Sequence, residues 1–119
     1  MYWFISKIVF RIIYPKQHGA QFDEQLRLIQ AENESAAFAR AQEIGFGEEE
    51  SFEDASHRKV QWTFIGIAEL YRLGELKDGL ELASRTDEPE QAEEYMSRIR
   101  FRSQEILKGL PLENLYNPN

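Results

Sequence analysis

Two histidines stand near carboxylates, and each could serve in proton transfer or metal binding. His18 lies in the polar segment after Pro15, shortly before Asp23 and Glu24. A histidine beside a carboxylate can act as a general acid or base near neutral pH. The segment contains Pro and Gly and is typical of a solvated connection. We therefore expect a solvent-exposed loop histidine at His18 and keep the three residues only as secondary polar-site candidates.

The second histidine, His57, follows the acidic residues Glu53, Asp54 and Glu48 to Glu50. Carboxylates coordinate hard cations, and an imidazole would add affinity for transition metals. The spacing matches neither an EF-hand loop nor a His-x-x-x-His pair. We expect a helix extension or an exposed acidic loop over residues 46–59 and assign no metal site, leaving open whether Glu48 to Asp54 binds a cation.

No catalytic or cofactor motif is recognisable elsewhere in the chain. The Gly45-Phe46-Gly47 sequence lacks the third glycine and the lysine of a phosphate-binding loop. There is no cysteine, which excludes a disulfide framework, thiolate catalysis and cysteine-ligated zinc, and is consistent with a reducing cytoplasm. The sequence therefore predicts a non-catalytic protein without a cofactor.

Charge and hydropathy limit the classes of partner. The formal net charge is -7, which disfavours sequence-independent binding to nucleic acid, although Lys7, Arg11 and Arg27 could form a local basic patch. Lys7 and Arg11 also interrupt the apolar N-terminal run, so it is neither a secretory signal nor a membrane span. We expect a cytoplasmic protein that binds itself or another protein and does not enter a membrane.

Residues 2–14 predict a long β-strand. Alternation places Phe4, Ile8, Phe10, Ile12 and Tyr14 on one face, which we expect to be core. The opposite face carries Trp3, Ile5, Lys7, Val9, Arg11 and Ile13. Its β-branched and aromatic content favours a strand over a helix.

Changes in the spacing of apolar residues along the chain predict the remaining elements. We expect a strand over residues 22–32, with Phe22, Leu26 and Leu28 on one face and Ile29 on the other, and a helix from the N-cap Asn33 to a stop at Gly45. A central strand over residues 60–68, a turn at Asp78-Gly79 and a strand at residues 80–83 come next. A second helix runs to residue 108, and its basic Arg98, Arg100 and Arg102 follow acidic first turns, as the helix dipole favours.

These elements predict an α+β domain over residues 1–108, with a partly ordered tail over 109–119. The order is strand, strand, helix, strand, strand, helix. The economical arrangement is a mostly antiparallel four-stranded sheet with both helices packed on one face. The length fits one domain.

Four stretches resemble one protein family. The N-terminal aromatic strand and residues 21–45, QFDEQLRLIQAENESAAFARAQEIG, together with WTFIGIAELYRL and LKDGLELASR, are similar to the family called domain of unknown function 4288. The resemblance extends over residues 2–107. It implies a bacterial, cytosolic protein and supplies no active-site residue.

Two functional hypotheses remain open. The first is an interaction or self-associating module whose contact surface is the mixed face with Trp3, Lys7 and Arg11. A strand this long would reach roughly 40 Å, so it must bend, bulge or overhang as an edge that pairs with another chain. The alternative is a small-molecule binder or small enzyme with a pocket between sheet and helices, using His18, Asp23, Glu24 or His57.

Overall fold

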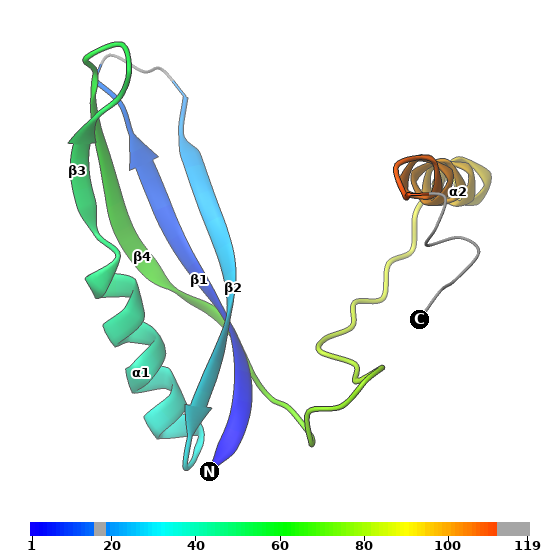
Figure 1. Cartoon of the computed structure of the whole chain (residues 1–119), viewed down its shortest axis with the longest axis horizontal. Coiled ribbons are helices and arrows are strands. Elements are labelled where there is room, and N and C mark those ends of the chain that lie inside the picture. The colour runs from blue at the N-terminus through cyan, green and yellow to red at the C-terminus, as the bar shows by residue number, and fades with distance from the viewer. Residues whose placement is uncertain (16–18, 112–119) are drawn as a thin grey trace. The chain divides into compact units, whose positions relative to one another are not determined.

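The computed structural model describes residues 1–15 and 19–111. The chain forms two compact units, Met1–Ser84 and Arg85–Asn119. The first unit contains a four-stranded antiparallel sheet and one helix (Figure 1). Four antiparallel strands and two helices follow one another in the expected order, so the predicted α+β class is confirmed.

The sheet has the strand order β2-β1-β4-β3. Its interior strands are β1 (Tyr2–Ile13) and β4 (Lys59–Arg72), and its edges are β2 (Gln21–Ala31) and β3 (Glu50–Glu53). β1 pairs with β2 in an unbroken register from Tyr2 to Ile12, and with β4 in a register interrupted twice by bulges. β1 is therefore not an edge strand, and the edge-pairing form of the interaction hypothesis is wrong. The long strand β1 is instead accommodated by two bulges in its pairing with β4.

One face of β1 is core, as the alternation predicts. Phe4, Ile8 and Phe10 are fully buried, together with Ser6, whose hydroxyl donates a hydrogen bond to the backbone carbonyl of Glu69 at 3.2 Å. Ile29 and Ala31 of β2 and Phe64 of β4 complete the sheet side of this core. The polar Ser6 is tolerated there because its only strong donor has a partner.

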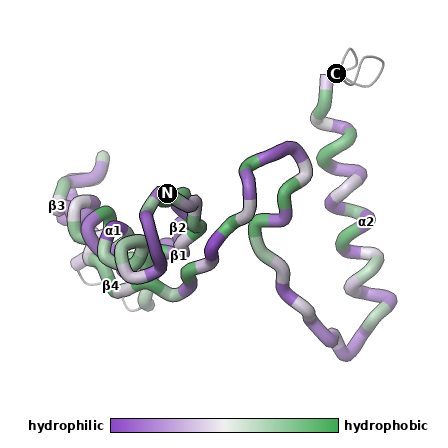
Figure 2. The backbone as a smooth tube through the Cα atoms, turned by 90° about the horizontal axis from the view of Figure 1, so that it is seen from below, coloured by the Kyte–Doolittle hydropathy of each residue, from purple (hydrophilic) through white to green (hydrophobic). Residues whose placement is uncertain are grey.

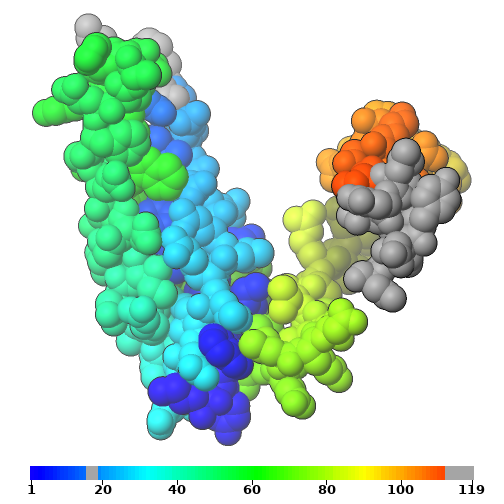
Figure 3. Space-filling view, in the orientation of Figure 1, coloured from blue at the N-terminus to red at the C-terminus, as the bar shows by residue number. Residues whose placement is uncertain are grey.

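The helix α1 (Glu34–Gly47) covers that face. The side chain of Asn33 caps it by accepting a hydrogen bond from the Ala36 N–H at 2.9 Å, as expected. Its buried residues are Ala37, Ala41 and Gly45, so the helix approaches the strands through a stripe of small side chains. In the space-filling view α1 lies alongside β2 (Figure 3).

Gly45 does not end the helix, contrary to the sequence prediction. α1 continues to Gly47, and a Cβ atom at position 45 would lie 2.5 Å from the ring of Phe64. The glycine is needed for close helix-to-sheet approach rather than for termination.

The fourth strand is also not where alternation placed it. Residues 80–83 form no strand, whereas Glu50–Glu53, expected to be loop or helix extension, pairs with Lys59–Trp62 as β3. The carboxylate of Asp54 organises the connecting turn by accepting hydrogen bonds from the N–H groups of Ser56 and Arg58, at 2.8 and 3.0 Å. The Arg58 backbone bond is the main reason that the pKa of Asp54 is lowered. The predicted Asp78-Gly79 turn does form, with Gly79 at a φ of 83°.

The second unit contains α2 (Ala92–Lys108), which begins with acidic residues and ends with Lys108, as predicted. Apolar and polar residues alternate along it (Figure 2). Packing of α2 on the sheet, and a single domain through residue 108, stay predictions. Of the expected tail, Gly109 forms the C-cap of α2, and residues 112–119 lie outside the described part of the chain.

The contact between Gly45 and Phe64 gives a test of this packing. Gly45→Ala should lower the free energy of unfolding by about 1–3 kcal/mol, because the added methyl group overpacks the helix-sheet interface. Gly47→Ala is the matched control, since nothing lies within 4 Å of its added Cβ. Urea denaturation should show Gly47→Ala as neutral or slightly stabilising. Equal effects of the two substitutions would contradict the assigned role of Gly45.

Candidate functional site

The face of the sheet opposite α1 is the most distinctive surface of the first unit. In the described residues of that unit, α1 is the one helix, and it lies over Phe4, Ile8 and Phe10. Alternate residues of β1, among them Trp3 and Lys7, point to the opposite side. We call this side of the four-stranded sheet the open face.

Large apolar side chains from β2 occupy the open face. Phe22, Leu26 and Leu28 pair with Arg11, Lys7 and Ile5 of β1, so their side chains share the same side of the sheet. They are 56%, 63% and 52% exposed. The sequence correctly placed the three on one face of their strand, and the register now shows that this face is not the core.

The neighbouring strands extend the apolar surface. On β4, Tyr71 pairs with Ile5, and Ile65 lies in a bulge between the core residue Phe64 and Gly66. Tyr71 is 45% and Ile65 55% exposed, and Ile13 at the end of β1 is 37% exposed. The open face thus carries six large exposed apolar residues drawn from three strands.

Lys7 lies at the centre of the open face in an ionic cluster. Its Nζ is 3.0 Å from Glu69 Oε2 and 3.5 Å from Glu24 Oε1. The hydroxyl of Tyr71 also donates a hydrogen bond to Glu69, at 2.9 Å. The hydrogen bond with Glu69 raises the pKa of Lys7, and the same bond lowers the pKa of Glu69. The lysine charge is therefore neutralised within the sheet.

The charges of this face balance. By strand register its basic residues are Lys7, Arg11 and Lys59, and its acidic residues are Glu24, Glu53 and Glu69. Three charges of each sign leave it neutral, on a chain whose net charge is -7. The structure does not bring together the basic patch hypothesised from the sequence: Arg27 pairs in register with the core residue Ser6 and contacts Glu48 at 3.4 Å.

The secondary polar-site candidates are not brought together. Asp23 and Glu24 are successive residues of β2 and point to opposite sides; Asp23 accepts a hydrogen bond from Gln25 at 2.7 Å. His57 lies in the turn between β3 and β4, 89% exposed in its side chain, with Nδ1 3.7 Å from Glu53. His18 lies outside the described residues. Within the described ranges, no group of three or more acidic or histidine side chains is placed to hold a metal ion.

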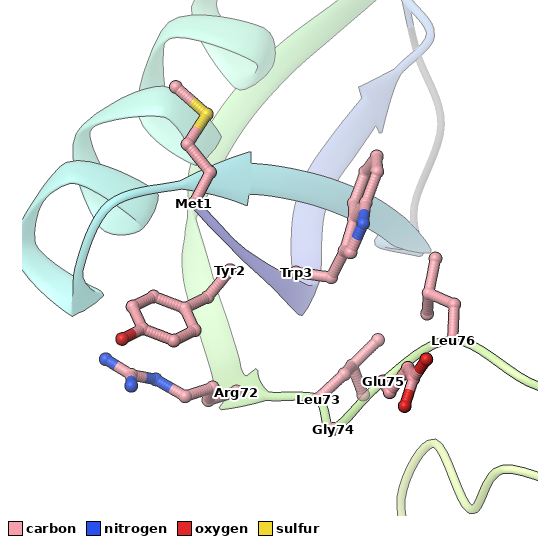
Figure 4. A pocket seen from close by; sticks show the side chains of 8 residues that line it. All are labelled: Met1, Tyr2, Trp3, Arg72, Leu73, Gly74, Glu75 and Leu76. Carbon is pink, nitrogen blue, oxygen red and sulfur yellow. The ribbon is translucent and has the colours of Figure 1, made fainter.

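Trp3 lines a pocket at one end of the sheet (Figure 4). The pocket measures about 650 Å³ and is lined by Met1, Tyr2, Trp3, Arg72, Leu73, Gly74, Glu75 and Leu76. The guanidinium of Arg72 stacks 4.0 Å above the Tyr2 ring and pairs with Glu34. The carboxylate of Glu34 therefore already balances its positive charge. None of Asp23, Glu24 and His57 lines this pocket.

Alternation placed Trp3, Lys7 and Arg11 on the side of β1 opposite the core, as the register has them, but sequence reasoning missed the residues that give the open face its apolar area. Ile65 and Tyr71 were not singled out, and Phe22, Leu26 and Leu28 were assigned no functional role. The signal that could have found them is the pairing of the two N-terminal strands, which sets Leu26 opposite Lys7.

The ionic cluster predicts a pH dependence. Because the pKa of Glu69 is lowered from 4.5, its ion pair stabilises the fold above that pH and is lost as the pH falls through the folded-state pKa. Glu69→Gln should therefore be less stable than the parent at pH 7, and the difference should shrink as the pH falls below 4.5 and Glu69 becomes protonated. Urea denaturation at pH 7 and at several values below 4.5 measures it, with Glu75→Gln as an acidic control outside the cluster. A difference that persists unchanged at low pH would contradict the ion-pair assignment.

Comparison with known proteins gives one match. In the described residues of the chain, no helix is both long and apolar enough to cross a bilayer. No curated protein and no solved structure matches the sequence. The model of one family, domain of unknown function (DUF4288), matches residues 3–84. This match ends where the first compact unit ends, and α2 lies beyond it. The chain belongs to the DUF4288 family.

Proposed function

We propose that the protein is a non-catalytic interaction module that self-associates through the open face of its sheet. The observation that supports this is the group of six exposed apolar residues on three adjacent strands: Phe22, Leu26, Leu28, Ile65, Tyr71 and Ile13. Exposed single hydrophobic residues are ordinary, but contiguous apolar patches of this kind mark interaction surfaces.

The area of the patch suits a dimer. With a full accessible area of roughly 150–250 Å² per residue, the exposed fractions amount to roughly 600 Å² of apolar surface. Stable interfaces bury about 800 Å² on each partner. The half-buried Trp3 and Val9, with the aliphatic stems of Lys7 and Arg11, lie on the same side and supply the remainder.

The neutral charge of the open face favours a second copy of this chain as its binding partner. Two chains of net charge -7 repel one another, so an interface between them is least opposed where each surface is neutral. The open face meets that condition, because Lys7 is paired with Glu24 and Glu69 inside each sheet. A two-fold arrangement would then place apolar residues of one copy on those of the other while the charge of Lys7 stays paired within its own sheet.

The origin, cellular location and kind of partner of this module are also part of the proposal. The resemblance to DUF4288 implies a bacterial protein, and the absence of cysteine suits a reducing cytoplasm. The balanced charge of the open face supports a protein partner over nucleic acid, which would need clustered, unpaired basic residues.

Small-molecule binding is the alternative function, and the end pocket favours it. A volume of about 650 Å³ is within the usual range of ligand sites, roughly 300–1,000 Å³. Its walls are Trp3, Leu73 and Leu76 with the carboxylate of Glu75 (Figure 4). Arg72 is held by Tyr2 and Glu34, which leaves the pocket few polar groups to orient a substrate.

Light scattering after gel filtration tests self-association. The parent chain should have twice the mass of the 14.0 kDa monomer. Leu26→Glu should give the monomer at the same concentration, because it puts a charge at the centre of the apolar patch. Leu82→Glu is the control: Leu82 is 50% exposed but lies outside the strands.

Two results would overturn the proposal. One is a parent chain that stays monomeric at about 1 mM, where an interface worth about 4 kcal/mol would be half formed. The other is a Leu26→Glu variant that dimerises as the parent does, which would place the interface elsewhere.

A further inference from the structure

A second, smaller cavity lies on the face of the sheet that carries α1, just past the C-terminal end of that helix. It measures about 320 Å³ and is lined by Gln25, Glu48, Glu50, Phe52 and Trp62. Strand register sets Glu50 opposite Trp62, and Phe52 opposite the core residue Val60. The side chains of Glu50 and Phe52 therefore face the same side as the core, where α1 no longer covers the sheet.

Two aromatic side chains form walls of this cavity. Trp62 packs against the core cluster and meets Phe10 in a tilted contact with ring centroids 5.9 Å apart, so its ring is held in place. Phe52 is 40% exposed. A tryptophan face is the best aromatic platform for a cation, and exposed aromatic pairs are the usual walls of sites for organic ammonium groups.

The remaining groups make the cavity electronegative. Glu48 is the C-cap of α1, so the partial negative charge of the helix end lies beside its carboxylate. Arg27 balances Glu48 at 3.4 Å. Glu50 has no ion-pair partner among the residues that the structure describes. One carboxylate and the helix end thus remain to attract a positive charge at the aromatic walls.

We propose that this cavity binds an organic cation, an ammonium or guanidinium group, with Trp62 and Phe52 against the cation and Glu50 as its counter-ion. Within the described residues no group of three or more acidic or histidine side chains is placed to hold a metal ion, which disfavours a metal ion here. The volume is near the lower limit of ligand sites and suits one head group with a short stem. The group could belong to a lysine or arginine side chain of a peptide or to a small free amine.

Nuclear magnetic resonance of the full chain tests the site through the indole N–H of Trp62. n-Butylammonium and a blocked Lys-Arg dipeptide amide are the cationic probes, and n-butanol is the neutral one. Both cations should shift the Trp62 signal and n-butanol should not. Tighter binding of the dipeptide amide identifies a peptide side chain as the source, and tighter binding of n-butylammonium identifies a small ligand.

Variants on β3 give the matched control. Glu50→Gln should weaken cation binding about tenfold, because it removes a charge-assisted partner. Glu53→Gln removes the same charge from the same strand, but Glu53 pairs with Lys59 on the other side of the sheet, and binding should be unchanged. Phe52→Leu should also weaken binding while keeping an apolar wall.

Three results would overturn the proposal: no shift of Trp62 by either cation, equal binding of n-butanol, or equal losses in Glu50→Gln and Glu53→Gln. Self-association is measured separately and does not enter this test, because the cavity and the open face lie on opposite sides of the sheet.

Discussion

The close approach of α1 to the sheet is the constraint on which the first unit depends. Ala37 and Ala41 are fully buried, and Gly45 leaves space that the ring of Phe64 fills. A helix with larger residues at these positions would stand farther from the strands and leave voids around Phe4, Ile8 and Phe10. The small-residue stripe thus lets one short helix cover Phe4, Ile8 and Phe10.

One helix can cover only one side of a sheet, and the strands are apolar on both. β1 buries Phe4 and Ile8 beneath α1, while β2 and β4 present leucines, isoleucine and tyrosine on the other side. Antiparallel sheets commonly keep that second side polar and solvated. Here the charges of the open face balance and Lys7 is paired with Glu24 and Glu69, so the side resembles an interface more than a solvated surface.

Most of the fold could be predicted from the sequence because the longer elements have a clear period. β1, β2, α1 and β4 each carry a repeated apolar pattern or a cap such as Asn33. β3 has four residues, all exposed, and forms because Asp54 folds the turn that returns the chain to β4. Gly45 was misread because its role depends on Phe64, a residue far along the chain that only the packed structure brings close.

The candidate sites were predictable only in part, for a related reason. Trp3, Lys7 and Arg11 were assigned to the correct side of β1 by alternation, but the apolar area beside them comes from neighbouring strands through register. Glu50 and Trp62 likewise lie opposite one another only because residues 50–53 form β3 and pair with β4. Since the open face and the cavity lie on opposite sides of one sheet, with register fixing both, a dimer through the open face would leave the cavity accessible. Association and cation binding can therefore operate together in one protein.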